Sequence, residues 1–482
     1  MRIFSRGPGR TPSGRRRRRW LLAAAVTSAL TASVSPAHAD GGDWVPVPDM
    51  KLARTGHGTT TAPCPDAVGA LGDGQCVYVV GGHPLEAALS LHAYSPGKRT
   101  WAKLPSMTVG RSGLAAATAP CPGGVKALRG TCVYAVGGTN GGGSLTTVEA
   151  YSPATNTWAT VPGMKSARAF LGAATAPCPP GETSLRGLCV YAVGGAARSG
   201  SAAGGTSAAG HAAAQAAAKG TGTGTAPAKT PAKDQAPAKD QAPAKSQAPA
   251  KDQAPAKTPA SASAKDPAPG KDPAPGTGTG SGQGAHVPGT GSGSTVTTLA
   301  TVEAYSPATN TWTTLPQLPS PRRSLGVTAA TCPRAVISTA PSCVYAVGGT
   351  GADTAEPLST VEVFDPESRA WVKLPSTPTA RRAMGVTSGP CPGSTSMVGT
   401  TCVYGIGGSP STQMTAVATT EIFAPRTNSW SAVPSLPEAR FGFGATAAPC
   451  SDDVARTCLY APGGMAGTTP SAHTSAFDVS RL

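Results

Sequence analysis

The stretch CVYAVGG at Cys132–Gly138 decides the fold of this 482-residue chain, because the chain repeats it. Identical copies stand at 189–195 and 343–349, and looser copies at 76–82, 402–408 and 458–464. Each copy is a short run of β-branched and aromatic residues, which favours a strand. The two closing glycines favour a tight bend, where a larger residue would block close backbone packing. The recurrence predicts a repeat protein of six equivalent units.

The second unit shows what surrounds the repeated strand. Arg111 opens a run of small residues that ends at Cys121, and a polar loop leads from there into CVYAVGG. An alternating segment at 147–153 and a tryptophan segment at 158–162 follow. All four segments are short and bounded by Gly, Pro, Asn or Ser, so each unit is expected to form four antiparallel strands. The spacing of neighbouring units, about 56–59 residues, is typical of a repeat architecture.

The order glycine pair, tyrosine, tryptophan, arginine resembles the kelch repeat. In the second unit it reads Gly137-Gly138, Tyr151, Trp158 and Arg168, and it recurs along nearly the whole mature chain. Kelch repeats form β-propellers, so the resemblance implies an all-β propeller with one four-stranded blade per unit. The cysteine pair in every unit departs from the family's pattern, because most kelch proteins lack it.

Strand counting predicts a six-bladed propeller with a closed ring. The third strand of each unit ends in an aromatic residue: Tyr94, Tyr151, Tyr305, Phe364, Phe423 and Phe477. Tryptophan strands follow the first five of these, at Trp101, Trp158, Trp312, Trp371 and Trp430. The segment at 43–48 supplies a tryptophan strand, at Trp44, with no third strand before it. This N-terminal strand is therefore expected to complete the last blade, which would remove the exposed sheet edges.

The twelve cysteines fall into six neighbouring couples, which favours local disulfides. The couples are Cys64 with Cys76, Cys121 with Cys132, Cys178 with Cys189, Cys332 with Cys343, Cys391 with Cys402, and Cys450 with Cys458. Zinc binding would need shorter cysteine spacings or nearby histidines, so no metal is expected. Six bridges require an oxidising compartment, and we predict an extracellular, secreted protein.

The net formal charge of +16 does not mark a nucleic-acid binder, because its excess lies outside the blades. Residues 1–39 contain eight arginines and no acid, followed by an apolar run and small residues at 37–39. This segment is predicted to be a cleaved signal peptide, with general secretory export preferred over the twin-arginine route. No stable membrane insertion is expected after cleavage, and we expect a monomer.

The third unit is interrupted by a segment of Ala, Pro, Lys, Gly and Thr at 196–296. It has no apolar periodicity and is predicted to be disordered. The propeller would then consist of residues 40–195 and 297–482. The insertion is interpreted as an inert spacer or as a basic arm for anionic wall polymers.

An arginine opens the first strand of each unit, and two units carry a second arginine beside it. These candidate ligand-binding residues are Arg54, Arg111, Arg168, Arg322, Arg323, Arg381, Arg382 and Arg440. In one interpretation they are framework groups that pair with acids on the third strands, such as Glu149, Glu303, Glu362 and Glu421. In the first unit His92 takes the position of these glutamates. In the other interpretation the arginines bind an acidic ligand at the mouth of the central channel, as arginines at this position do in animal kelch adaptors. Arg323 and Arg382 exceed the repeat pattern and are the preferred candidates.

These observations favour a non-catalytic binding or scaffold protein for an acidic peptide, protein or glycan, with no cofactor. The alternative is a carbohydrate-active enzyme, because galactose oxidase and bacterial sialic-acid epimerases also have kelch propellers. An oxidase would need copper ligands, and His57 and His83 offer only two near the channel mouth. An epimerase would need an acid–base pair, for which Glu86, Glu356 and Glu438 are the loop carboxylates.

Overall fold

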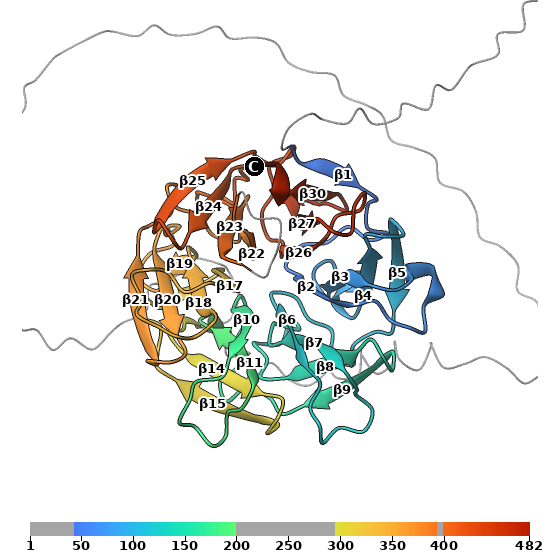
Figure 1. The fold of residues 1–482 in the computed structure, drawn as a ribbon, viewed down its shortest axis with the longest axis horizontal. Coiled ribbons are helices and arrows are strands. Elements are labelled where there is room, and N and C mark those ends of the chain that lie inside the picture. The colour runs from blue at the N-terminus through green and yellow to red at the C-terminus, as the bar shows by residue number, and fades with distance from the viewer. Residues whose placement is uncertain (1–42, 199–294, 393–398) are drawn as a thin grey trace, which may run out of the picture.

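A computed structural model describes residues 43–198, 295–392 and 399–482 as a ring of sheets around a central channel (Figure 1). The predicted signal peptide and nearly all of the predicted insertion lie outside the described residues. The described chain is almost entirely β-structure, apart from one short α-helix and two short 3-10 helices. None of its helices has the length and apolar character needed to cross a bilayer.

Six four-stranded antiparallel sheets form the blades, and each is ordered from the channel outward. Blade 1 holds β2 (Gly58–Pro63), β3 (Gln75–Val80), β4 (Leu91–Ser95) and β5 (Thr100–Leu104). Blade 2 holds β6 (Ala115–Pro120), β7 (Thr131–Val136), β8 (Val148–Ser152) and β9 (Thr157–Val161). Blade 3 holds β10 (Gly172–Pro177), β11 (Leu188–Val193), β14 (Val302–Ser306) and β15 (Thr311–Leu315). Blade 4 holds β17 (Gly326–Ala330), β18 (Cys343–Val347), β20 (Val361–Asp365) and β21 (Ala370–Leu374). Blade 5 holds β22 (Gly385–Pro390), β23 (Thr401–Ile406), β24 (Thr420–Ala424) and β25 (Ser429–Val433). Blade 6 holds β26 (Thr446–Pro449), β27 (Thr457–Pro462), β30 (Thr474–Asp478) and β1 (Val45–Val47).

Blade 6 combines the two ends of the described chain. β1 pairs antiparallel with β30, with Val45 opposite Ala476 and Val47 opposite Thr474. The Trp44 ring packs against Phe477 at a centroid distance of 5.3 Å, like the tryptophan and aromatic pairs of the other blades. The first and last strands of Figure 1 therefore lie side by side in one sheet.

The tryptophans also connect neighbouring blades around the outside of the ring. Each indole N–H of the six tryptophans in the described residues donates a hydrogen bond to a proline carbonyl of the preceding blade, at 2.7–3.0 Å. The circle includes the junction of the two chain ends, because Trp44 binds Pro434 and Trp101 binds Pro48. Apolar side chains of adjacent blades fill the space between the sheets, as where Tyr78 of blade 1 packs with Tyr151 of blade 2. The hydrophobic core is thus distributed between blades.

The double glycine of each repeat has a geometric cause. Gly137 and Gly138 have φ values of 60° and 99°, a region that side chains rarely adopt. A Cβ atom on Gly137 would lie 2.6 Å from the carbonyl oxygen of Arg168 in the next blade. The glycines are required because the second strand turns here directly against its neighbour's backbone.

Six disulfides join the first and second strands of the blades, in the pairing that the cysteine spacing predicted. Their Cα atoms lie 4.9 Å apart in every case, as expected for residues that face each other across a hairpin. In blades 1 to 6 in turn, the bridges join Cys64 to Cys76, Cys121 to Cys132, Cys178 to Cys189, Cys332 to Cys343, Cys391 to Cys402, and Cys450 to Cys458. The second cysteine of each pair is buried at the start of the repeated strand, so each bridge fastens an outer loop to the blade core.

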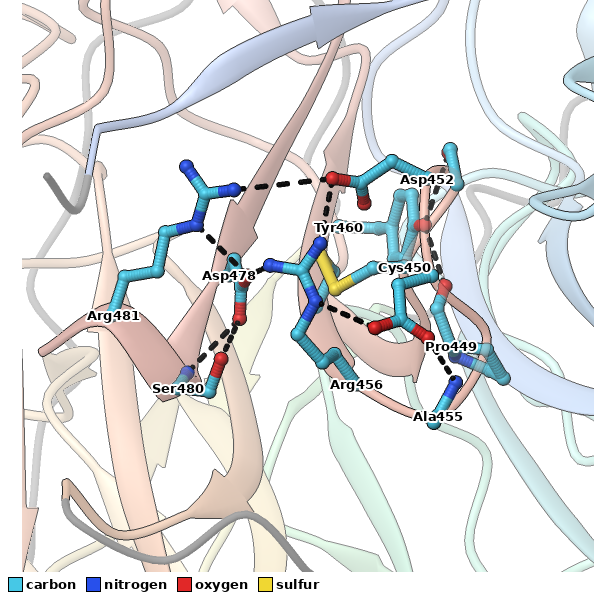
Figure 2. The surroundings of a disulfide bond; sticks show 12 residues. Pro449, Cys450, Asp452, Ala455, Arg456, Tyr460, Asp478, Ser480 and Arg481 are labelled. Carbon is cyan, nitrogen blue, oxygen red and sulfur yellow. Dashed lines mark hydrogen bonds and ion pairs between the residues drawn. A yellow bond between two sulfur atoms is a disulfide. The ribbon is translucent and has the colours of Figure 1, made fainter. Parts of the chain in front are cut away.

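The disulfide of blade 6 closes the shortest loop, and Figure 2 shows the ion pairs around it. Arg456 of this loop contacts Asp452, Asp453 and Asp478, and Arg481 also contacts Asp478. These contacts fasten the loop to the C-terminal strand and the 3-10 helix Val479–Arg481.

Short additional helices and strand pairs lie in the loops between the blade strands. They are α1 (Leu85–Ala88), a 3-10 helix at Gly69–Leu71, and the pairs β12 (Ala196–Arg198) with β13 (Val296–Thr298), β16 (Arg322–Arg323) with β19 (Thr350–Gly351), and β28 (Met465–Ala466) with β29 (Thr469–Pro470). The β12–β13 pair corrects the predicted insertion boundary, because residues 196–198 and 296 belong to a small sheet on blade 3.

Candidate functional site

The two ends of the channel are made by different loops. We call one end the arginine face: it carries the loops from the second to the third strand of each blade and those from one blade to the next, including 52–57, 83–90 and 350–360. The other end, the disulfide face, carries the bridged loops and the turns from the third to the fourth strand. A ligand on either face therefore meets a different set of side chains.

A ring of six peptide groups surrounds the channel on the arginine face. The N–H of one residue per blade donates to the carbonyl of the equivalent residue in the neighbouring blade, at 2.7–2.8 Å. The ring runs through Gly56, Gly442, Ala383, Ser324, Phe170 and Gly113, and returns to Gly56. All six residues have positive φ, which turns their peptide groups along the ring. The hydrogen-bonded backbone thus forms a closed ring at this face, which also crosses the junction of blades 1 and 6.

The six arginines that open the first strands lie inside the framework. Arg54, Arg111, Arg168, Arg322, Arg381 and Arg440 are fully buried. Each Nη1 donates to a carbonyl of the glycine pair of its own blade, as Arg111 does to Gly137 at 3.0 Å. The Nε atoms of Arg322, Arg381 and Arg440 have no partner among the described residues, but a guanidinium with no exposed surface is not available to a ligand at the surface. These six residues belong to the framework and not to the ligand-binding set.

In blades 2–5 each framework arginine also pairs with the third-strand glutamate. The pairs are Arg111–Glu149, Arg168–Glu303, Arg322–Glu362 and Arg381–Glu421. Glu149 additionally accepts hydrogen bonds from the backbone N–H groups of Thr108 and Val109 in the preceding loop. The glutamate therefore ties the guanidinium and the loop together.

Blades 1 and 6 lack this carboxylate. The Arg54 Nη2 lies 2.7 Å from Nδ1 of His92, and the Arg440 Nη2 donates to the Ser475 hydroxyl at 3.0 Å. Burial lowers the pKa of Arg54 to about 10. Burial, with the charge of Arg54 as a further cause, lowers the pKa of His92 to about 4. The neutral imidazole thus accepts a hydrogen bond from Arg54 without neutralising its charge.

Arg323 and Arg382 differ from their buried neighbours. Both are half-buried on the arginine face, in blades 4 and 5. The Arg323 Nη1 donates to the Thr298 hydroxyl at 2.6 Å, and the Arg382 Nη2 donates to the Thr412 carbonyl at 2.7 Å. Arg382 Nε is buried without a partner among the described residues. Neither side chain forms an ion pair with a carboxylate in the described ranges.

The charges of Arg323 and Glu356 both act on Arg382. Burial lowers the pKa of both arginines, and the charge of Arg323 lowers the pKa of Arg382 further, while Glu356 opposes this shift. A partly desolvated guanidinium without an ion-pair partner would be stabilised by an anion that binds it.

The protein-family model for the kelch motif matches residues 123–165 and 331–378 of the chain. The matched segments run through blades 2 and 4, and the other four blades repeat the same strand order, glycine pair and tryptophan contact. The chain is a kelch-repeat β-propeller. This fold is typical of protein-binding scaffolds, and binding residues in proteins are often carried by loops on a rigid framework.

Exposed apolar residues accompany the two arginines on the arginine face of this kelch propeller. Leu85 in α1, Phe170 in the peptide ring and Met414 in the blade 5 loop are 74 %, 46 % and 50 % exposed. A depression of about 100 Å³ at the channel mouth is lined by Phe170, Leu171 and Phe443, among others. Aromatic residues, methionine and arginine are enriched at protein interfaces. The face therefore combines charge with the apolar surface that a protein partner would cover.

Phe170 is a candidate that the repeat analysis missed. The equivalent positions hold only Gly, Ser or Ala, as at Gly113 and Ser324. The aromatic residue at a small-residue position was the available sequence signal, and the structure shows that its φ is 55°. Its ring lies over Gly113, where a Cβ atom would approach it to 2.9 Å.

The residues considered for catalysis are spread over the arginine face. His83 is exposed and its backbone pairs with Thr55, whereas His57 is buried at the channel, where its Nε2 lies 3.0 Å from the Pro462 carbonyl. Glu86 lies in α1 of blade 1, Glu356 in a blade 4 loop, and Glu438 lies 4.0 Å from Arg440 in the loop entering blade 6.

Two groups of side chains have the spacing of metal ligands within the described ranges. They are Cys332, Cys343 and Asp365 in blade 4, and Cys450, Cys458 and Asp478 in blade 6. The two cysteines of each group form a disulfide, which offers no thiolate to a metal. Neither group is therefore a candidate metal centre.

Proposed function

We propose that this kelch propeller is a non-catalytic binding protein of an extracellular compartment, and that it holds an acidic segment of a protein, peptide or glycan on its arginine face. The six disulfides support an oxidising environment. The observation that carries the proposal is Arg323 and Arg382, two half-buried arginines of adjacent blades that form no ion pair with a carboxylate among the described residues. A carboxylate that binds their exposed guanidinium nitrogens would supply the counter-charge that neither receives from an ion pair.

The surroundings of the pair define the ligand further. Arg323 is held by Thr298 of the β13 strand, and Arg382 by the carbonyl of Thr412, so both side chains are pre-oriented before a ligand arrives. The apolar depression beside them would accept an uncharged side chain of the partner. An acidic residue next to an apolar residue is therefore the sequence feature that the site would select.

The test compares two double variants with the same net charge. Arg323→Ala with Arg382→Ala removes the proposed site, whereas Arg334→Ala with Arg426→Ala removes two exposed arginines from the disulfide face of the same two blades. A fluorescent hexaglutamate peptide and an oligogalacturonate serve as acidic probes, and anisotropy measures their dissociation constants with the mature protein.

The first double variant is expected to weaken binding of at least one probe tenfold or more, because each charge-assisted hydrogen bond contributes about 1.5–3 kcal/mol. The second is expected to change binding only slightly. Equal weakening by both double variants would show that binding follows overall charge, and would refute the assignment of the site.

A further inference from the structure

The central channel contains a cavity that is separate from the arginine pair. Its volume is about 440 Å³, within the range of roughly 300–1,000 Å³ found for small-molecule pockets. The innermost strands of all six blades line it. Each of these strands pairs with a neighbour on one edge only, so its second edge offers backbone N–H and carbonyl groups to the channel.

The side chains of the cavity are uncharged and rich in hydroxyl groups. Hydroxyls come from residues such as Thr61, Thr118, Thr175 and Ser388, and small or apolar residues separate them. Among the described residues that line it there is no Asp, Glu, Lys or Arg. The wall can both donate and accept hydrogen bonds but cannot neutralise a charged ligand.

Several polar atoms of this wall lack partners. The Nδ1 atom of His57 and the hydroxyls of Thr59 and Thr175 are buried and make no hydrogen bond among the described residues. The Nε2 atom of His57 contacts the Pro462 carbonyl, which requires the proton on Nε2 and leaves Nδ1 as an acceptor. Burial lowers the pKa of His57 to about 3, so this ring stays neutral near pH 7. A ligand hydroxyl would satisfy such an acceptor.

The peptide ring limits access from the arginine face. The residues that follow it directly along the chain of each blade are His57, Leu114, Leu171, Leu325, Met384 and Phe443. The hydroxyl-bearing residues lie further along the innermost strands, toward the bridged loops. The disulfide face therefore offers the more open route to the polar part of the cavity.

We propose that the channel binds a small neutral polyhydroxylated molecule, a sugar or polyol, which enters from the disulfide face. Its hydroxyls hydrogen-bond to His57 Nδ1, to the threonines and to the unpaired strand edges. Its C–H surfaces pack on the alanine, valine and leucine side chains.

The test uses D-glucose, D-galactose and myo-inositol as neutral probes, with D-glucuronate as a charged counterpart. Saturation-transfer NMR detects contact with the mature protein, and calorimetry gives the dissociation constants. His57→Leu installs the residue that blades 2–4 carry at this position, and Thr175→Val removes one hydroxyl while keeping its shape. Thr160→Val, on the exposed outer strand β9, is the matched control.

At least one neutral probe is expected to bind, and each channel variant is expected to weaken it roughly fivefold or more, as for loss of one hydrogen-bond partner. Thr160→Val and the double variant of Arg323 and Arg382 should leave this binding unchanged, which separates the channel site from the acidic-ligand site. If His57→Leu does not fold, Thr175→Val decides the outcome. The proposal is overturned if no neutral probe receives saturation, if both channel variants bind as the wild type does, or if glucuronate binds more tightly than the neutral probes.

Discussion

Blades 2–5 and blades 6 and 1 solve the same packing problem with different chemistry. In both groups a fully buried arginine binds the carbonyl groups of the glycine turn. In blades 2–5 a buried glutamate neutralises this arginine, whereas Ser475 and the neutral His92 take that place in blades 6 and 1. The propeller keeps its geometry in both cases, which teaches that the arginine's contacts with the backbone are the constant element.

The difference leaves two buried guanidinium groups at one junction without a buried counter-charge, because Glu438, which lies 4.0 Å from Arg440, is exposed. Blades 6 and 1 are neighbours around the ring, and the charges of Arg54 and Arg440 add to burial in lowering the pKa of His57 between them. Removal of a carboxylate should therefore lower the free energy of unfolding most in blades 2–5. Protonation of buried histidines should lower it most at the junction of blades 6 and 1.

The largest expected effect is that of Glu149→Ala in blade 2. It leaves Arg111 buried without its counter-charge and frees the loop at Thr108, so the free energy of unfolding should fall by about 3–5 kcal/mol. The matched change Ser475→Ala in blade 6 removes one hydrogen bond to Arg440 and should cost only about 1 kcal/mol. Chemical denaturation of both variants with disulfides intact measures the difference. Equal losses would show that the glutamate has no special role.

The second effect concerns acid. His57 and His92 have pKa values lowered to about 3 and about 4, whereas the unfolded chain has the ordinary value near 6.5. The unfolded state therefore binds protons first as the pH falls. The stability that the two neutral histidines contribute is fully present above pH 6.5. It is lost as the pH falls toward their pKa values in the folded state, by roughly 2–3 kcal/mol for each histidine at pH 4. Denaturation curves from pH 7 to pH 4 should show a shallower decline for His92→Gln, which keeps an acceptor but cannot titrate. An unchanged pH dependence would contradict the buried neutral assignment.

A smaller gain is expected from His92→Glu, which gives blade 1 the pair found in blades 2–5. Arg54 is already buried in the wild type, so the new carboxylate adds an attraction to it without burying a further positive charge. The free energy of unfolding at pH 7 should therefore rise by about 1–2 kcal/mol. Thermal unfolding of the variant beside the wild type measures this gain. A lower melting temperature would mean that blade 1 cannot accommodate the carboxylate.

Much of the fold follows from the sequence because the repeat is so regular. The glycine pairs, tryptophans and cysteine couples each have one local role, and the strands and disulfides lie where their spacing indicated. The strand at 45–47 lies in blade 6 beside β30, where a tryptophan strand was otherwise lacking.

The candidate site followed less well from the sequence. Arg322 and Arg323 are adjacent and identical in type, yet one is fully buried and the other half-exposed, because strand alternation turns them to different surroundings. The peptide ring is formed by backbone groups of six distant residues, and the small residues at five of these positions do not by themselves indicate that the backbone groups bind one another. The small β12–β13 sheet was missed because Ala196–Arg198 resembles the low-complexity segment that follows it.

The central claim is that the repeated arginines hold the framework while Arg323 and Arg382 serve a ligand. The most direct measurement follows the melting temperature and the binding of the hexaglutamate probe together in the variant that carries Arg323→Ala and Arg382→Ala. The account predicts a melting temperature close to that of the wild type and binding weakened at least tenfold. A melting temperature lowered by many degrees with binding unchanged would contradict it.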